Sequence, residues 1–261
     1  MNILQVKNLK VYFNAPGGIV KAVDDVSFDI EEGKVFGIVG ESGSGKTLTA
    51  LSILKLISWP GNIAGGSIIF NGKDLLNIDE KDLRGVRGSE ISIVFQEPAS
   101  SFNPVFTIGE QIVETIMKHQ SVDPDKAKDI ALTYLHRVHI NEADRIFYDY
   151  PHQLSGGTKQ RAMIAMALVN SPKLVILDEP TTALDVSIQA QILDLLKEII
   201  LKEKLSVLFI SHDFGIVSRM CDRVAVMRKS RIVESGTTKE VLKNPREAYT
   251  ISLLESVKAL S

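Results

Sequence analysis

The sequence contains very little cysteine. Cys221 is the single cysteine among 261 residues, so the chain cannot form an internal disulfide. This scarcity fits a reducing compartment, where structural disulfides are rare. We expect Cys221 to act as a small buried residue rather than as a reactive thiol.

Long hydrophobic runs and an excess of charge are also absent. No apolar run reaches the roughly 18 residues needed to cross a bilayer, and the N-terminus lacks the layout of a signal peptide. We therefore expect a soluble protein, which would need other subunits to provide spanning helices if it acts at a membrane. Lysine and arginine total 30 against 32 aspartates and glutamates, a net charge of −2. This balance excludes a broad basic field for wrapping nucleic acid.

The composition that is present is ordinary for a globular protein, with 44% hydrophobic and 24% charged residues. The length suits one large domain, or a domain with a subdomain. Residues 3–13 and 19–30 carry alternating and mixed apolar stretches around a turn at 14–18, which predicts antiparallel strands. A further strand is predicted at 67–72, after chain breakers at Gly65 and Gly66.

The clearest motif follows a short apolar run at residues 35–39, which predicts a buried strand. It has the pattern G-x-x-x-x-G-K-[ST] of a phosphate-binding loop and leads into a helix predicted from Thr47. Its residues are Gly40, Glu41, Ser42, Gly43, Ser44, Gly45, Lys46 and Thr47. Backbone N–H groups and the helix dipole favour a phosphate there. Lys46 would reach the β- and γ-phosphates, and the Thr47 hydroxyl would bind Mg²⁺.

Three later apolar runs predict strands that end in polar side chains. These are Gln96 after residues 91–95, Asp178 and Glu179 after residues 174–177, and His212 after residues 206–210. Side chains at the carboxyl ends of strands face the ligand in α/β sheets. Because carboxylates are costly beside a buried strand, we expect Asp178 to hold Mg²⁺ and Glu179 to polarise an attacking water.

Much of the remaining chain has helical spacing. Apolar residues three or four apart predict helices within 107–148, one of which starts at Asp123. Another helix opens at residues 154–168, and its first residues Ser155, Gly156 and Gly157 form a second potential anion site. Residues 223–234 predict a last hairpin, and the tail from Lys239 predicts a polar helix.

Together and in this order, these motifs resemble the nucleotide-binding subunit of ABC transporters over nearly the whole chain. The resemblance implies an α/β fold of the P-loop NTPase type, with a RecA-like mixed or parallel sheet core, an antiparallel β subdomain and a helical subdomain. It also implies a single ABC ATPase domain over residues 1–261, which binds ATP and Mg²⁺ and hydrolyses the ATP. The core would take about 1–95 and 155–261, and the helical subdomain about 96–154.

The same resemblance implies roles for the site residues. The catalytic residues would be Glu179, His212, Gln96 and Lys46, and the Mg²⁺ ligands would be Thr47, Gln96 and Asp178. Besides the phosphate-binding loop, the nucleotide would contact Phe13, Ser155, Gly156, Gly157 and Asp185. Phe13 is favoured for stacking on adenine, with Tyr12 as the alternative. Residues 182–185 resemble the D-loop of the family, and the signature residues of one subunit would cover the γ-phosphate held by another.

Finer features resemble one branch of the family, the importers of oligopeptides, dipeptides and nickel. They lie at residues 17–24, 96–109 and 244–250. The resemblance favours peptide import, with nickel or metal-chelate import as the alternative. Many members continue into a cysteine-bearing extension, and with only Cys221 before the end at Ser261 we expect no iron–sulfur cluster.

The resemblance implies several partners. These are a second ABC ATPase subunit, in a heterodimer with a homodimer as the alternative, two membrane-spanning permease subunits and, indirectly, an extracytoplasmic solute-binding protein. No nucleic acid partner is expected, and the chain would lie at the cytoplasmic face of the cell membrane as a peripheral subunit. A soluble ABC ATPase without a transport role is the remote alternative, disfavoured because the sequence has no long heptad segment and no cysteine cluster.

Overall fold

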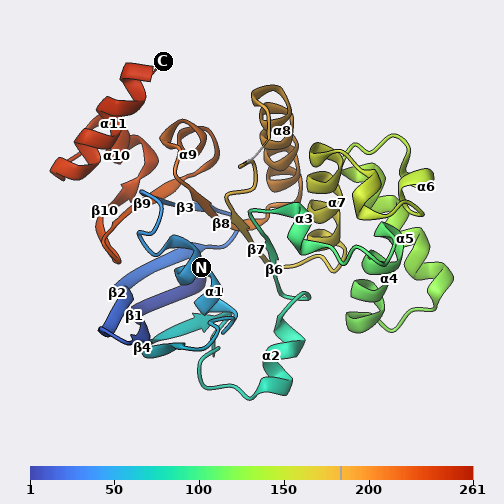
Figure 1. Cartoon of the computed structure of the whole chain (residues 1–261), viewed down its shortest axis with the longest axis horizontal. Helices are drawn as coiled ribbons and strands as arrows, with labels where there is room; N and C mark the ends of the chain where they lie inside the picture. Colours follow the sequence, from blue (N-terminus) through green and yellow to red (C-terminus); the bar gives the residue numbers. More distant parts are fainter. Residues whose placement is uncertain (183, 261) are drawn as a thin grey trace. The chain divides into compact units, whose positions relative to one another are not determined.

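The computed structural model describes residues 1–182 and 184–260, and the chain forms two compact units. The first contains residues 1–83 and 206–261, and the second contains residues 84–205. Figure 1 colours the chain along its sequence, so the first unit carries the blue and the orange to red tones and the second the green and yellow tones.

The first unit contains an antiparallel sheet in the order β2-β1-β4-β5. Its strands are β1 (Asn2–Ala15), β2 (Gly18–Glu31), β4 (Gly61–Phe70) and β5 (Lys73–Asp74). The predicted pair of strands around a turn is confirmed, and Phe13 lies opposite Val20 in the register. Alternating burial along β2 gives the sheet one covered face, as expected where one side packs on a core.

The start of β4 differs from the sequence prediction. Gly65 and Gly66 were expected to precede the strand, but β4 already begins at Gly61 and passes through both. Gly66 has a φ of 101°, and a side chain there would lie 2.7 Å from the Cα of Leu9. The register also shifts near Lys10, so the glycines form an irregularity within the strand rather than a break before it.

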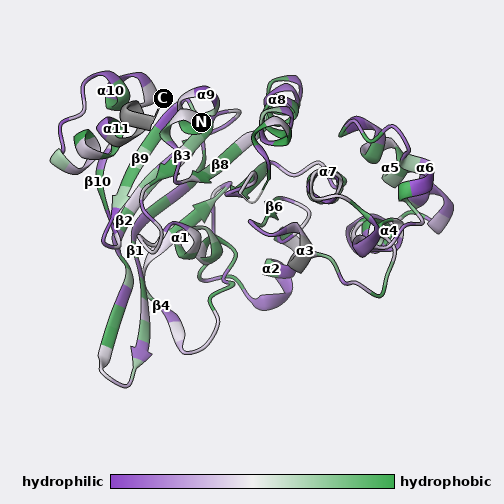
Figure 2. Cartoon of the chain, turned by 45° about the horizontal axis from the view of Figure 1, so that its top comes forward, coloured by the Kyte–Doolittle hydropathy of each residue, from purple (hydrophilic) through white to green (hydrophobic). Residues whose placement is uncertain are grey.

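The first unit also holds the strand that leads to the phosphate-binding loop. This strand, β3 (Val35–Val39), belongs to a second sheet, to which the first unit also contributes β8 (Ser206–Ser211), β9 (Arg223–Arg228) and β10 (Arg231–Thr237). β3 pairs in parallel with both β8 and β9, and β10 is antiparallel to β9. All residues of β3 and β8 are buried, which fits their nearly continuous apolar sequences. Figure 2 shows β3 and β9 as largely hydrophobic.

Short helices complete the first unit. They are α1 (Lys46–Ile53), α9 (Phe214–Met220), α10 (Thr238–Lys243) and α11 (Ala248–Leu260), and α2 (Glu80–Val86) spans the boundary between the units. The tail is helical as predicted, but it is not polar throughout, since Val241 and Tyr249 are buried. Cys221 is the C-cap of α9 and is also buried, as predicted. A Cβ at Gly37 of β3 would lie 2.9 Å from its Sγ.

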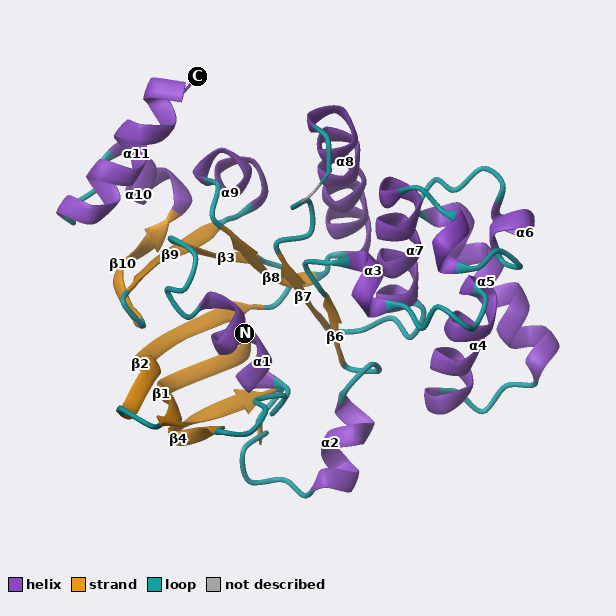
Figure 3. Cartoon of the chain, viewed as in Figure 1, coloured by secondary structure: helices purple, strands orange, loops and turns teal. Residues whose placement is uncertain are grey.

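The second unit contains a parallel pair of strands and most of the helices (Figure 3). The strands are β6 (Ile91–Val94) and β7 (Leu174–Asp178). The helices are α3 (Pro98–Ser101), α4 (Ile108–His119), α5 (Pro124–Arg137), α6 (Ala143–Ile146), the 3₁₀ turn η1 (Pro151–Gln153), α7 (Gly156–Leu168) and α8 (Val186–Glu203). The predicted helices within 107–148 are confirmed. Thr107 and Glu110 form a capping box on α4, and Asp123 caps α5 by accepting from the N–H of Lys126 at 2.8 Å.

In the described part of the chain, no helix combines the length and the apolar character that crossing a bilayer requires.

Candidate functional site

The phosphate-binding loop lies between β3 and α1, as the sequence predicts. The helix begins at Lys46, one residue earlier than expected. Gly43 and Gly45 have φ values of 77° and 105°, a left-handed conformation that lets successive N–H groups face the inside of the loop. A side chain at Gly45 would also collide with the carbonyl oxygen of Ala22. The loop is therefore a concave site for an anion at a helix N-terminus.

Two polar side chains of the loop fit a bound phosphate. Lys46 is 5% exposed, and its Nζ donates to the carbonyl oxygens of Gly40 at 2.8 Å and Glu41 at 2.9 Å. The Ser44 hydroxyl is buried and has no hydrogen-bond partner among the described residues. Burying a hydroxyl without a partner is costly. A phosphate oxygen would satisfy this hydroxyl, so the residues of the loop fit the phosphate groups of a nucleotide.

His212 lies at the same edge of the sheet as this loop. β3 and β8 run parallel with Val39 opposite Ser211, so the residues that follow these two strands leave at one edge. His212 is exposed, and its neighbour Asp213 caps α9 by accepting from the N–H of Gly215 at 2.6 Å. Because the cap fixes the turn, His212 is held beside the carboxyl end of β8. The first unit thus brings together the loop and His212 at one edge of the sheet.

The second unit brings Gln96 and Glu179 together. They follow the parallel strands β6 and β7, in which Val94 lies opposite Leu177. The Glu179 Oε2 accepts hydrogen bonds from Gln96 Nε2 at 3.3 Å and from Thr182 Oγ1 at 2.9 Å. Glu179 has a φ of 47°, which is rare for a residue with a side chain and is found at functional sites. The arrangement presents a carboxylate held by two donors, suited to orienting a water.

Asp178 is the last residue of β7 and is 2% exposed. A carboxylate so deeply buried needs a cation or strong hydrogen bonds. A carboxylate oxygen is a ligand that Mg²⁺ prefers, and the side chains of the other predicted ligands, Thr47 and Gln96, also carry oxygen atoms. The chemistry of each of these side chains therefore fits the predicted ion.

The signature residues begin α7 as the sequence predicts. Ser155 is the N-cap, and its Oγ accepts from the N–H of Thr158 at 3.2 Å. Side chains at Gly156 and Gly157 would lie 3.4 Å from Leu184 Cδ2 and 2.8 Å from Ile188 Cγ2. The first distance is an ordinary contact and the second is too short for one, so glycine at position 157 lets the start of α7 lie close to the start of α8.

Asp185, the remaining predicted nucleotide contact of the second unit, is the N-cap of α8. Its Oδ1 accepts from the N–H of Ile188 at 3.0 Å. Of the predicted D-loop at 182–185, Ala183 lies outside the described residues. The sequence assigned Asp185 a role in the site and missed this structural role, although an aspartate before a helix is a familiar capping signal.

The two candidate aromatic residues at the end of β1 have different surroundings. Phe13 is partly exposed and lies opposite Gly61, where a side chain would collide with its ring. The Tyr12 hydroxyl donates to Asp24 Oδ1 at 2.8 Å, and this bond to a carboxylate raises the pKa of Tyr12. Because Tyr12 is already engaged, Phe13 stays our prediction for stacking on adenine.

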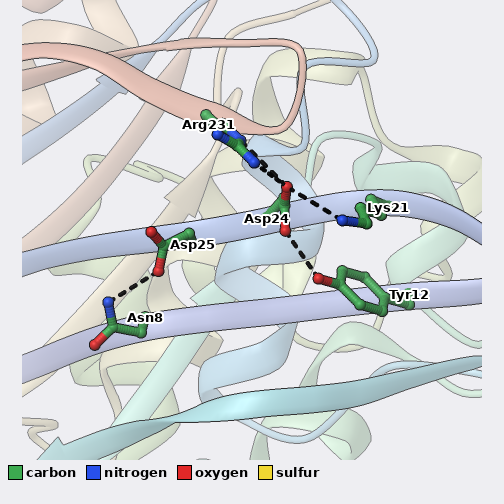
Figure 4. A network of polar contacts seen from close by, with 6 residues as sticks. All are labelled: Asn8, Tyr12, Lys21, Asp24, Asp25 and Arg231. Carbon is green, nitrogen blue, oxygen red and sulfur yellow. Dashed lines mark hydrogen bonds and ion pairs between the residues drawn. The ribbon is translucent and has the colours of Figure 1, made fainter.

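A polar network around Asp24 was not predicted from the sequence (Figure 4). Asp24 Oδ2 accepts from Arg231 Nε at 3.2 Å and from its Nη2, and Lys21 Nζ lies 3.8 Å away. The hydrogen bond from Arg231, followed by that from Tyr12, lowers the pKa of Asp24 below its ordinary value. The network ties β2 to the start of β10, and Ala22, which contacts the phosphate-binding loop, lies two residues before Asp24.

Comparison with known protein families tests the family resemblance that the sequence motifs suggest. The family model described as ABC transporter matches residues 23–182, a span that contains the phosphate-binding loop, Gln96, the signature residues and Glu179. The chain belongs to the ABC transporter family. The predicted family and the predicted type of activity, that of an ABC transporter ATPase, are thereby confirmed.

Solved structures confirm the ABC ATPase fold. The ATP-binding cassette MJ0796, in a dimeric post-hydrolysis state bound to ADP and Pi, is similar with a TM-score of 0.80 and 26% identity. The match covers 90% of this chain and 98% of that one. The structure of cbiO1 from Clostridium perfringens, part of the ABC transporter complex cbiONQ, gives a TM-score of 0.79 and 28% identity over 99% of this chain and 98% of that one.

Relatives of higher identity are named as transport ATP-binding proteins. The oligopeptide transport ATP-binding protein OppD of Bacillus subtilis is 47% identical over 99% of this chain, which spans 72% of that protein. The dipeptide transport ATP-binding protein DppD of the same organism is 46% identical, again over 99% of this chain and 77% of its own length. The peptidoglycan transport ATP-binding protein YejF of Agrobacterium fabrum is 51% identical over 97% of this chain, which spans only 46% of that protein.

Proposed function

We propose that this chain is the ATP-binding and ATP-hydrolysing subunit that powers an ABC importer of peptides. The observation that carries the proposal is its similarity over nearly its whole length to proteins named for oligopeptide and dipeptide transport. These names favour peptides over nickel or metal chelates, the alternative that the sequence left open.

The phosphate-binding loop would hold the triphosphate of ATP. Its N–H groups, the helix dipole of α1 and the Lys46 ammonium place positive charge around the β- and γ-phosphates. The main demand of this reaction is to stabilise the negative charge on the transferring phosphoryl group. Donors and positive charges that are already in place before the reaction do this effectively. His212, at the same sheet edge, would donate to the γ-phosphate.

Glu179 would orient the attacking water or accept its proton. Its carboxylate is already fixed by the donors Gln96 and Thr182, so little reorganisation is needed when the water binds. Thr47, Gln96 and Asp178 would hold Mg²⁺, which when bound neutralises negative charge on the phosphate oxygens.

A second ATPase subunit would complete the site. We propose that the start of α7, with Ser155, Gly156 and Gly157, covers the γ-phosphate bound by that second subunit, and that Asp185 acts near the same boundary. Two membrane-spanning permease subunits, contacted through residues 97–109, and an extracytoplasmic solute-binding protein complete the importer. The chain would then lie at the cytoplasmic face of the cell membrane.

The catalytic role is tested by Glu179→Gln, which keeps the size of the side chain but removes its charge. We expect ATP to bind normally and hydrolysis to fall about 10²–10³-fold, since a base or charge-stabilising group is lost. Glu198→Gln is the control, because Glu198 is exposed and its Oε2 lies 3.5 Å from Nε2 of the surface residue His139. Steady-state hydrolysis near the wild-type rate in Glu179→Gln would contradict the assignment.

Peptide import is tested by reconstituting the chain with its permease subunits and solute-binding protein in vesicles. We expect ATP-dependent uptake of a labelled oligopeptide, no comparable uptake of Ni²⁺, and loss of uptake with Glu179→Gln. Uptake of Ni²⁺ without uptake of peptide would replace the peptide proposal by its alternative.

A further inference from the structure

The N-terminus of α11 is fixed by a carboxylate of β10. Glu234 Oε1 accepts from the N–H of Arg246 at 2.8 Å, and Oε2 accepts from the N–H of Glu247 at 3.2 Å. Burial alone would raise the pKa of Glu234, but the hydrogen bonds that it accepts outweigh burial and its pKa lies below the ordinary value. Glu234 therefore stays charged and holds the segment 244–250, which sequence resemblance tied only to the importer branch.

This cap places Tyr249 directly beside the phosphate-binding loop. Tyr249 is 6% exposed, and its hydroxyl oxygen accepts a hydrogen bond from the backbone N–H of Glu41 at 3.2 Å. The Arg228 guanidinium lies over the Tyr249 ring, 4.4 Å from its centroid. A tyrosine in a short C-terminal helix is thus fixed on two sides and bonded to the second residue of the loop.

Arg228 belongs to a turn that holds the same loop at another point. The backbone N–H of Ser230 donates to the carbonyl oxygen of Ser44 at 3.1 Å, and the Ser230 carbonyl accepts from the N–H of Asp24 at 2.8 Å. The carbonyl oxygen of Met227 lies so close to Gly40 that no side chain would fit there. The segment 227–230 therefore contacts the phosphate-binding loop at Gly40 and Ser44, and Tyr249 binds it at Glu41. Arg228 links this segment to Tyr249 through its contact with the ring.

We propose that Tyr249 is a positioning residue that keeps the phosphate-binding loop in its nucleotide-binding conformation. Its hydroxyl satisfies the Glu41 N–H, which would otherwise be free to reorient with the peptide at the entrance of the loop. Without this bond the loop samples other conformations before ATP binds. The apparent affinity for ATP then falls in proportion to the fraction of chains with a competent loop.

The test is Tyr249→Phe, which removes the hydroxyl and keeps the ring under Arg228. Tyr134→Phe is the matched control, because Tyr134 is also buried and its hydroxyl makes one bond, 3.1 Å long, to Ser171 in the second unit. A fluorescent ATP analogue with Mg²⁺ is titrated into each chain. We expect the Kd of Tyr249→Phe to rise about threefold to tenfold, the range of one lost hydrogen bond, and that of Tyr134→Phe to stay at the wild-type value.

Two further measurements separate positioning from a general loss of stability. Hydrogen exchange of the nucleotide-free chain should become faster at residues 40–45 in Tyr249→Phe and stay unchanged in the strands β3 and β8. In the assembled transporter, KM for ATP should rise by the same factor as Kd while kcat is kept. A Kd unchanged in Tyr249→Phe, a faster exchange spread over the whole first unit, or a lower kcat at constant KM would each overturn the proposal.

The inference rests on the proposed binding of ATP at this loop, and the wild-type titration tests that point separately. A wild-type chain that fails to bind the nucleotide contradicts the proposed function. If the wild-type chain and Tyr249→Phe bind the nucleotide with the same Kd, only the role of Tyr249 is contradicted.

Discussion

At the scale of single residues, the polar groups that matter most are those with partners distant in the sequence. Asp24 and Arg231 are 207 positions apart, and Glu41 and Tyr249 are 208 apart. No local sequence pattern predicts such pairs, because their contacts form only once β9, β10 and α11 have folded back onto the first strands. Gln96, Glu179 and His212 could be predicted, since each directly follows an apolar strand and polar groups there face a ligand.

The Asp24 network predicts a pH dependence of stability. The pKa of Asp24 is lowered in the folded chain, so its contribution is fully present above the pKa of an unfolded aspartate, about 3.9, and is lost as pH falls through the folded pKa. We therefore expect Asp24→Asn to unfold at a lower urea concentration than the wild type at pH 7. The difference should shrink as the pH is lowered below about 4.

Urea unfolding at several pH values measures this difference. Asp29→Asn is the control on the same strand, since Asp29 is half-exposed and its Oδ2 lies 3.9 Å from Arg223 Nη1. A deficit of Asp24→Asn that stays constant from pH 7 to pH 3 would mean that the Asp24 charge is not what stabilises the fold.

At the scale of helices and strands, most of the architecture follows from local signals. The buried strand β7 and the capped starts of α4, α5 and α7 lie within a residue or two of their predicted positions, because caps and apolar periodicity are local properties. β4 was misjudged because a pair of glycines is a local signal for a break, whereas here Gly66 lies within the strand and lets Leu9 of β1 approach closely, which is a tertiary contact. The buried Tyr249 was missed for the same reason.

Asp185 lets the structural and functional parts of one helix start be separated. Asp185→Ala removes the cap of α8 and should lower the free energy of unfolding by about 1 kcal/mol, whereas Asp185→Asn should restore it because asparagine caps equally well. If Asp185 also acts at the nucleotide site, Asp185→Asn will keep a reduced rate of ATP hydrolysis. Chemical denaturation and ATPase assays on both variants, with Asp194→Asn within α8 as a control, decide this. Full activity in Asp185→Asn would leave only the capping role.

At the scale of the whole molecule, the proposed function divides the ATP site between two subunits, and the signature residues of this chain would act at the ATP bound by its partner. The proposed shared site predicts that the chain alone hydrolyses ATP slowly. Addition of its native partner ATPase should raise turnover, because only then is each γ-phosphate covered by a second helix N-terminus. Turnover measured at fixed chain concentration against added partner tests this. If turnover instead rises steeply with the concentration of the chain alone, the result would contradict the heterodimer and indicate a homodimer.

The contact between Cys221 and Gly37 offers a way to time motion in the first unit. Burial raises the pKa of the Cys221 thiol far above its ordinary value, so an alkylating reagent cannot modify it while α9 lies on β3. Since the sequence contains no other cysteine, every modified chain records one opening of this helix. The rate of alkylation, followed by mass in the presence and absence of ATP, would therefore act as a clock for how often the strand that carries the nucleotide loop loses its cover.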